Sequence, residues 1–164
     1  MNSCTAANGA TTCTNFPGSR AMNFNPSLAY WNGTLYIGYE EYDNTHALRM
    51  FTSTDNGQTI QENTNITNNN EDTTSTEPSL LVTTQNGNVP PTMYVGFRSN
   101  DSGHNFLWKY STDGVNYTAS TNTGIQMTSR PVLVQGVSSF TPYITAFYSS
   151  NDSNYYLYQA TTTF

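Results

Sequence analysis

The feature that most restricts the fold of this chain is a polar turn that occurs twice in the same sequence context. Ser53-Thr54-Asp55-Asn56-Gly57 and Ser111-Thr112-Asp113-Gly114 each follow a hydrophobic and aromatic run and precede a short strand-like run. The residues from Leu35 to Asp55 align without a gap with Met93 to Asp113, at an offset of 58 residues. Internal repeats of this kind predict a fold built from similar units that stack on one another.

A third, shorter unit follows the first two. The prolines that open the three units, Pro26, Pro78 and Pro131, are 52 and 53 residues apart. Asn32-Gly33 and Asn86-Gly87 mark a hairpin turn after the first strand of two units. Each period holds about four short β-rich runs, which indicates propeller blades, and no stretch keeps a helical period for three turns. We therefore predict an all-β protein composed of four-stranded β-propeller blades.

The predicted blades form a single β-propeller domain over residues 1–164. Blade 1 covers about 26–65, blade 2 about 78–122 and blade 3 about 131–164, and the last lacks its polar turn and fourth strand. Residues 8–15 resemble that strand, so we expect them to complete blade 3. Three blades are too few to close a ring, which predicts a six-bladed ring of two chains, a homodimer in which this strand comes from the partner. A piece of a longer propeller and a β-solenoid are the alternatives.

The composition limits the partners that the protein can have. Charged residues make up 10% of the 164 residues, and the net charge is −6 with five Lys and Arg. Since no stretch is basic, we expect no nucleic-acid binding, and the apolar runs are too short for a membrane span. No signal peptide is visible, but the Lys-poor, Asn- and Thr-rich composition favours a secreted or cell-surface protein. Cys4 and Cys13 leave open both a small-loop disulfide and two free thiols.

The two polar turns carry a resemblance to a known family. Ser53 to Ile60 resembles the Asp-box, Ser-x-Asp-x-Gly-x-x-aromatic, of sialidase-like (BNR-repeat) propellers, with Ile60 in place of the aromatic residue. The segment from Ser111 to Tyr117 resembles a form one residue shorter. The resemblance implies that both turns join the third and fourth strands of a blade, on the face opposite the binding site. Their role is then structural, because Ser and Asp side chains bond backbone amides; the Asp-box residues are Ser53, Asp55, Gly57, Ser111, Asp113 and Gly114.

The predicted ligand face is formed by the loops at the other end of the blades. Carboxylates and amides pair with sugar hydroxyls, Arg donates in a fork, and Trp or Tyr stacks on a sugar ring. Structural alternatives remain: Asn-Asp-Ser loops are ordinary turns, Trp108 could belong to the core between blades, and the two histidines could share a packing or turn-bonding role. The candidate sugar-binding residues are Trp31, Asp43, His46, Arg49, Arg98, Asn100, Asp101, His104, Trp108, Arg130, Tyr148 and Asp152.

We predict a lectin, a carbohydrate-binding protein whose similar glycan sites around the ring act together through multivalency. Sialidases of the resembled family use three arginines, a Tyr activated by a Glu, and an Asp acid/base. The family's Arg-Ile-Pro element is absent, and no Tyr–Glu pair can be assigned by motif. We therefore expect no enzymatic activity, no catalytic residue, no metal and no cofactor. A sialidase-like glycoside hydrolase and a non-catalytic structural or protein-binding propeller are the alternatives.

Overall fold

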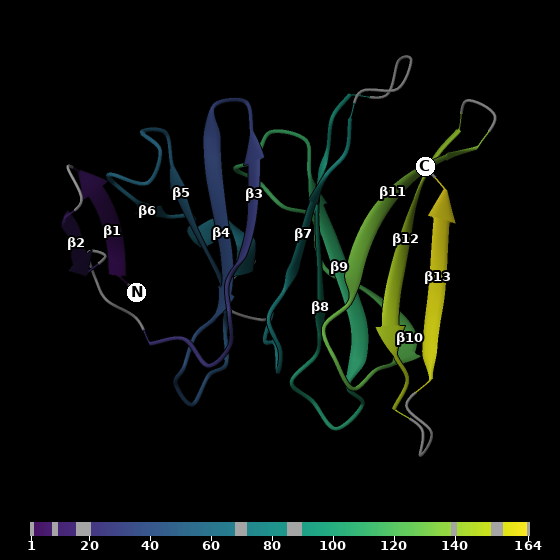
Figure 1. Cartoon of the computed structure of the whole chain (residues 1–164). Coiled ribbons are helices and arrows are strands. Elements are labelled where there is room, and N and C mark those ends of the chain that lie inside the picture. Colours follow the sequence, from purple (N-terminus) through teal and green to yellow (C-terminus); the bar gives the residue numbers. More distant parts are fainter. Residues whose placement is uncertain are drawn as a thin grey trace.

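The computed structural model describes residues 2–7, 10–15, 21–67, 72–84, 90–138, 141–151 and 156–163. In this part of the chain the regular elements are β-strands, apart from one 3-10 turn, η1 (Thr64–Thr67). The strands form a two-stranded sheet followed by three antiparallel sheets, which stand side by side in chain order (Figure 1). The prediction of an all-β protein is therefore confirmed. No helix long and apolar enough to cross a membrane occurs among the described residues.

Each of the three sheets is a meander in which consecutive strands pair. The first sheet consists of β3 (Ser27–Trp31), β4 (Thr34–Glu40), β5 (Leu48–Ser53) and β6 (Gln61–Glu62). The second consists of β7 (Ser79–Val82), β8 (Met93–Arg98), β9 (Asn105–Ser111) and β10 (Thr121–Gln126). The third has three strands among the described residues: β11 (Val132–Ser138), β12 (Thr141–Ser149) and β13 (Leu157–Thr163).

The N-terminal strands differ from the expectation. β1 (Asn2–Ala7) pairs with β2 (Ala10–Asn15), and the backbone register places Cys4 opposite Cys13. We expected residues 8–15 to supply a strand to the third sheet and assigned no strand to the residues before them. Two Thr- and Ala-containing segments so close in sequence pair with each other at a low loop-closure cost. Pairing of residues 8–15 with the third sheet of a partner chain stays a prediction.

The first strands of the three sheets are joined by a repeated hydrogen bond. The backbone N–H of Leu80 donates to Ser27 Oγ (3.1 Å), and the N–H of Leu133 donates to Ser79 Oγ (3.2 Å). Both serines directly follow the proline that opens their unit. Each first strand lies at the edge of its sheet, where some backbone N–H groups have no partner within the sheet. Each serine hydroxyl thus accepts a hydrogen bond from one such N–H group of the next sheet. Val132 holds the corresponding position in the third sheet and has no hydroxyl.

A second repeated contact lies at the same end of these strands, just before each first strand begins. In each unit, an isolated antiparallel bridge joins two residues that lie outside the strands. One residue lies four positions before the proline that opens the unit, and the other comes directly after the second strand, which is β4, β8 or β12. The same connection therefore enters all three sheets in the same way, as the repeats predict. The bridged pairs are Met22 with Glu41, Thr74 with Ser99, and Met127 with Ser150.

Apolar side chains fill the gaps between neighbouring sheets. Met50 and Met93, from the first and second sheets, share one buried cluster with Tyr117. Phe106 and Ile144, from the second and third sheets, belong to another. Since each sheet has apolar residues on both faces, burial between sheets is the main stabilising contribution to this stack.

Both turns that resemble the Asp-box, at residues 53–57 and 111–114, show the predicted bonding to backbone amides. Ser53 Oγ accepts a hydrogen bond from the N–H of Gly57 (2.8 Å), and Asp55 accepts from the side chain and backbone of Thr59 (2.6 and 2.8 Å). These bonds lower the pKa of Asp55 to about 2, with the Thr59 hydroxyl as the largest cause. In the second turn, Ser111 and Asp113 accept from backbone amides in the same manner.

Gly114 is where the second turn touches the first sheet. Its φ is +74°, and a Cβ at this position would lie 2.0 Å from the hydroxyl oxygen of Tyr36. Gly33, in the turn between β3 and β4, has nearly the same φ, +79°, but nothing lies within 4 Å of a Cβ built there. Both glycines therefore need a positive φ, but only Gly114 packs closely against another side chain.

We expect Gly114→Ala to destabilise the protein more than Gly33→Ala. Both substitutions force alanine into the left-handed region, which costs about 1–2 kcal/mol. Only Gly114→Ala also displaces Tyr36, and overpacking of this kind adds about 1–3 kcal/mol, or roughly 3–10 °C in melting temperature. Thermal unfolding followed by circular dichroism measures the difference. Equal melting temperatures for the two variants would show that the turn does not pack on Tyr36.

Candidate functional site

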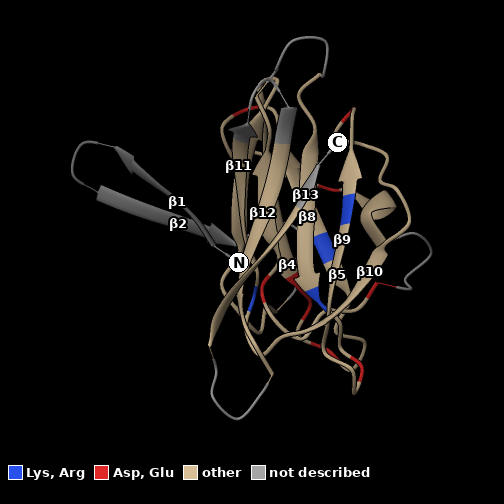
Figure 2. Cartoon of the chain, turned by 90° about the vertical axis from the view of Figure 1, so that its right-hand side faces the viewer, with Lys and Arg blue, Asp and Glu red and all other residues tan. Residues whose placement is uncertain are grey.

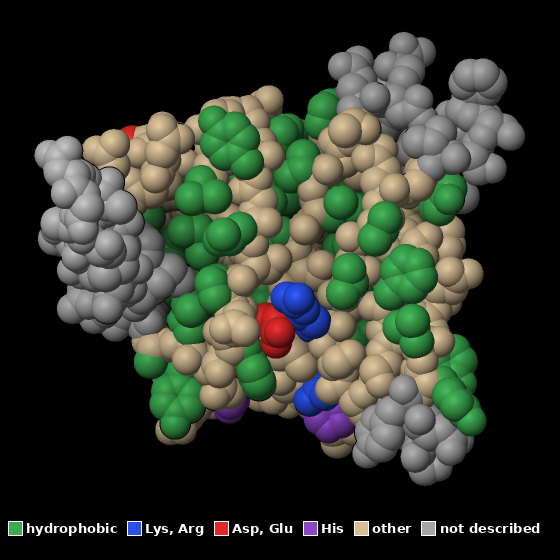
Figure 3. Space-filling view, viewed as in Figure 1, with side chains coloured by type: hydrophobic (Ala, Val, Ile, Leu, Met, Phe, Trp, Pro, Cys, Tyr) green, Lys and Arg blue, Asp and Glu red, His purple; other side chains and the backbone are tan. Residues whose placement is uncertain are grey.

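Most of the charged residues in the described part of this charge-poor chain lie toward one end of the strands (Figure 2). This end lies opposite the Asp-box turns, because the register places Glu40 beside Leu48 and Leu35 beside Ser53 at the two ends of β4 and β5. We call it the loop end; it comprises residues 41–47, 72–76, 99–104, 127–131 and 150–151 with the strand ends next to them. The two histidines of the chain appear along the lower edge of the face in Figure 3, which belongs to the loop end.

Glu40, the last residue of β4, is the most buried acidic side chain at the loop end. It has 0% exposure. Its Oε1 lies 2.5 Å from His46 Nδ1, whereas its Oε2 has no hydrogen-bond partner among the described residues. A buried carboxylate oxygen that lacks a partner is costly, so a hydroxyl group that reached Glu40 Oε2 would remove this cost.

Arg98 occupies the position in the second sheet that corresponds to Glu40 in the first. Its Nε donates to Ser75 Oγ (2.8 Å), and its Nη1 donates to the carbonyl of Thr128 (2.5 Å). The guanidinium therefore connects the segments that enter the second and third sheets. Burial lowers the pKa of Arg98, and the nearby charge of Glu40 opposes that shift. Glu40 and Arg98 thus interact electrostatically across the first and second sheets.

Two further buried polar atoms at the loop end have no hydrogen-bond partner among the described residues: His104 Nδ1 and Ser150 Oγ. Both residues adjoin Met127, whose N–H donates to the carbonyl of His104 (3.0 Å) and which bridges to Ser150. Together with Glu40, each of the three sheets contributes one such atom. Trp31 Nε1, at the opposite end of β3, is a further atom of this kind. Buried polar groups are normally satisfied, so the three such atoms at the loop end make it the candidate site.

Asp43 and Asp101, both candidate sugar ligands, hold their own turns. Oδ1 of Asp43 accepts from the N–H of Thr45 and of His46, and Oδ1 of Asp101 accepts from the N–H of Gly103 and of His104. These bonds lower the pKa of both carboxyls; the largest cause is the Thr45 hydroxyl for Asp43 and the Ser99 hydroxyl for Asp101. His46 and His104 end these turns with φ values of +52° and +47°. Both histidines therefore take part in the hydrogen bonding of their turns through their backbone N–H groups, which was the structural alternative to a role in sugar binding.

The other charged candidates at the loop end are in ion pairs. Arg49 donates to Glu41 (2.8 Å) and lies 3.6 Å from Glu62. Arg130 lies 3.6 Å from Glu77, and its side chain is 44% exposed. Because Arg49, Arg98 and Arg130 each have different partners, the structure does not bring them together on one ligand position.

The aromatic candidates are dispersed. Trp31 is buried in the core between the first and second sheets with 8% exposure, so its ring is not available to stack on a sugar. Tyr148 stacks on Tyr158 at a centroid distance of 6.0 Å. Trp108 lines a cavity between the second and third sheets. Asn100 is exposed at the loop end, and Asp152 lies outside the described residues.

Sequence reasoning missed Glu40 and Ser150 as members of this site. A signal did exist: the aligned position that ends the second strand holds Glu40 in the first unit and Arg98 in the second, a reversal of charge within a repeat. It also missed a polar groove of about 510 Å³ at the Asp-box end, lined by Asn63 and Asp113 among others. The described residues contain no group of three or more His, Cys, Asp and Glu side chains arranged to hold a metal ion.

Comparison with known proteins does not place the chain in a family. No protein-family model matches it, and no curated protein matches it. The geometry of the loop end is therefore the basis for assigning a function.

Asp101 makes the order of the loop end dependent on pH. Its folded pKa is lowered, so its contribution to stability is complete above the unfolded pKa of about 3.9 and is lost as the pH falls through the lower folded value. We expect the melting temperature of the wild type to fall more between pH 6 and pH 3 than that of Asp101→Asn, which cannot titrate at this position. Parallel pH curves for the two proteins would contradict a structural role of this carboxylate.

Proposed function

We propose that the protein is a carbohydrate-binding protein that takes up glycans at the loop end. The observation that carries this proposal is a set of three buried polar atoms there that have no hydrogen-bond partner within the described part of the chain, namely Glu40 Oε2, His104 Nδ1 and Ser150 Oγ. The loop end also carries exposed Tyr42, with 62% exposure, and the half-exposed Arg130. Hydroxyl-rich ligands satisfy buried acceptors and donors and stack their C–H faces on aromatic rings.

In the proposed complex a sugar hydroxyl donates to Glu40 Oε2. A second oxygen of the sugar accepts from the Arg98 guanidinium, which is partly desolvated and held by Ser75 and Thr128. A hydrogen bond to a charged group in a dry site is stronger than one in water. The repeated units offer related positions at the other sheet ends, and several weak sites together give avidity on a glycan surface.

The sialidase-like alternative lacks a supporting observation. A clamp of three arginines on one carboxylate needs guanidinium groups that point to a common place, whereas Arg49, Arg98 and Arg130 are held by Glu41, Ser75 and Glu77. A non-catalytic protein-binding role is the second alternative, and absence of glycan binding would favour it.

The proposed assembly is a six-bladed, Asp-box propeller ring of two chains. Leu28 and Tyr30 on β3 are 60% and 63% exposed, although their counterparts Leu80 and Val82 pack on the preceding sheet. Val132 and Val134 on β11 are 47% and 45% exposed, although their counterparts in β7 face the next sheet. The chain thus has two apolar end faces of the kind that its internal junctions cover, and a second copy would cover both through two-fold symmetry.

We expect purified wild-type protein to bind one or more glycans on an array and Glu40→Gln to bind them at least tenfold more weakly. Loss of a hydrogen bond to a charged acceptor removes about 1.5–3 kcal/mol. Asp113→Asn makes the same carboxyl-to-amide change at the opposite end of the sheets, and its glycan affinity should equal that of the wild type. Binding to no glycan by the folded wild type would refute the proposal; a fluorogenic sialoside assay tests the hydrolase alternative separately.

We expect a solution mass of twice 18.2 kDa for the wild type in light scattering after size-exclusion chromatography. Tyr30→Asp and Val134→Asp place a charge on the two end faces, so each should shift the protein to the monomer. Val115→Asp is the matched control, because Val115 is 53% exposed in the second Asp-box turn and should leave the mass unchanged. A wild-type monomer at the concentrations of a binding assay would overturn the two-chain ring.

A further inference from the structure

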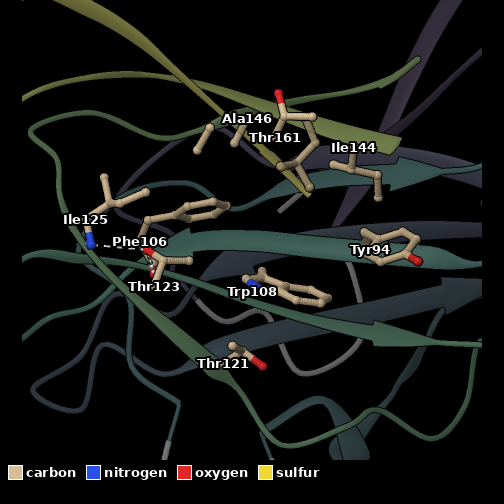
Figure 4. A pocket seen from close by; sticks show the side chains of 11 residues that line it. Tyr94, Phe106, Trp108, Thr121, Thr123, Ile125, Ile144, Ala146 and Thr161 are labelled. Carbon is tan, nitrogen blue, oxygen red and sulfur yellow. Dashed lines mark hydrogen bonds between the residues drawn. The ribbon is translucent and has the colours of Figure 1, made fainter. Parts of the chain in front are cut away.

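A cavity of about 330 Å³ opens between the second and third sheets. Trp108 and Tyr94 form one wall, and Ile144 and Ala146 form the other (Figure 4). The rings of Trp108 and Tyr94 are 6.0 Å apart and tilted by 34°. The lining is mainly aromatic and aliphatic, and its volume falls within the range of small-molecule sites.

The corresponding space between the first and second sheets is occupied. There the phenol ring of Tyr117 enters from the second Asp-box turn, and its hydroxyl lies 3.1 Å from Met50 Sδ and 3.2 Å from Met93 Sδ. Tyr36 belongs to the same buried cluster. In the alignment of the repeats, Tyr36, Met50 and Met93 correspond to Tyr94, Trp108 and Ile144. The residues that surround Tyr117 in one gap are therefore the counterparts of those that line the cavity in the next.

Two alanines enlarge this space further. Ala146 and Ala160, which are cross-strand partners in β12 and β13, correspond to Val95 and Lys109, which are partners in β8 and β9. Lys109 is fully buried between the first and second sheets and donates to Asp72 and to the carbonyl of Ile66. Ala160 has no such side chain, so the gap between the second and third sheets lacks the counterpart of the Lys109 alkyl chain at this position.

We propose that this cavity binds a free small molecule with a planar, mainly apolar ring of the size of phenol or indole. The residues that line the cavity correspond to those that surround the phenol ring of Tyr117 between the first and second sheets. Trp108 in place of Met50 adds an aromatic face. Offset or tilted ring contacts are favourable in such a site. The exposed Thr121, paired with Trp108 across β10 and β9, offers a hydroxyl at the rim for the polar tip of the ligand.

The site stays open in the proposed two-chain ring. In the alignment of the Asp-box segments, the residue of the N-terminal segment that corresponds to Ile60 and Tyr117 is Thr12. A strand from residues 8–15 of a partner would therefore bring a small polar side chain, and no aromatic ring, to this position. The ligand proposal is independent of the glycan site, because the cavity lies between the sheets and shares no residue with the loop end.

The test uses 4-methylphenol, which reproduces the tyrosine side chain, and the fluorescence of Trp108 in a Trp31→Phe background. We expect saturable quenching with a dissociation constant of about 0.1–10 mM, as befits a ligand of so few atoms. Ala160→Met introduces an uncharged side chain about as long as the alkyl part of Lys109, the counterpart of Ala160. It should fill the cavity and weaken binding at least tenfold. Gln159→Met is the matched control, since the neighbouring residue of β13 points to the opposite face of the sheet, and it should bind as the wild type does.

Three results would overturn the proposal. The first is the absence of saturable quenching in the folded protein, and the second is equal affinity in Ala160→Met and the control. The third is dissociation of a dimer into monomers by 4-methylphenol, measured by light scattering, because a side chain of a second copy would then be the natural occupant of the cavity.

Discussion

The arrangement of the sheets depends on apolar burial between them, and one repeated hydrogen bond joins their first strands within that packing: a backbone N–H of one first strand donates to the serine hydroxyl of the preceding one. Ser27 and Ser79 each make this bond to the next sheet. It joins β3 to β7 and β7 to β11. Side chains fill the space between the sheets, with Met50, Met93 and Tyr117 in one gap and Phe106 and Ile144 in the other. The two gaps differ in how this filling is done.

Much of the fold is readable in the sequence because it is encoded locally. Hydrophobic runs bounded by Asn-Gly and by Ser-x-Asp turns predict strands and their order, and the spacing of Pro26, Pro78 and Pro131 predicts three similar units. The pairing of β1 with β2 was missed because a short strand can add to either of two edges with similar local preference. Which edge it takes depends on the rest of the chain.

The candidate site was harder to predict than the fold, for a related reason. Asp43 and Asp101 look like ligand carboxylates in a loop, but a carboxylate beside Gly, Ser or Thr is as readily used to bond the amides of its own turn. Glu40 has no motif around it. Its importance comes from burial beside residues of another sheet, and burial arises only when the sheets pack. In a repeat sequence, a site formed by buried charged residues can be recognised from aligned positions that differ in charge, such as Glu40 and Arg98.

Val132 occupies the position at which the other two units have a serine. The two ends of the stack therefore differ, and a junction at the third sheet would be weaker than the internal ones. Any sheet that packs against the third one meets an edge with no hydroxyl to receive its N–H group. Such a junction relies on apolar contact alone, whereas the internal junctions add a hydrogen bond of about 1 kcal/mol. In a closed ring, opening would therefore begin at the boundary between copies and leave each three-sheet unit intact. Dilution, rather than local unfolding, becomes the variable that sets how many units act together.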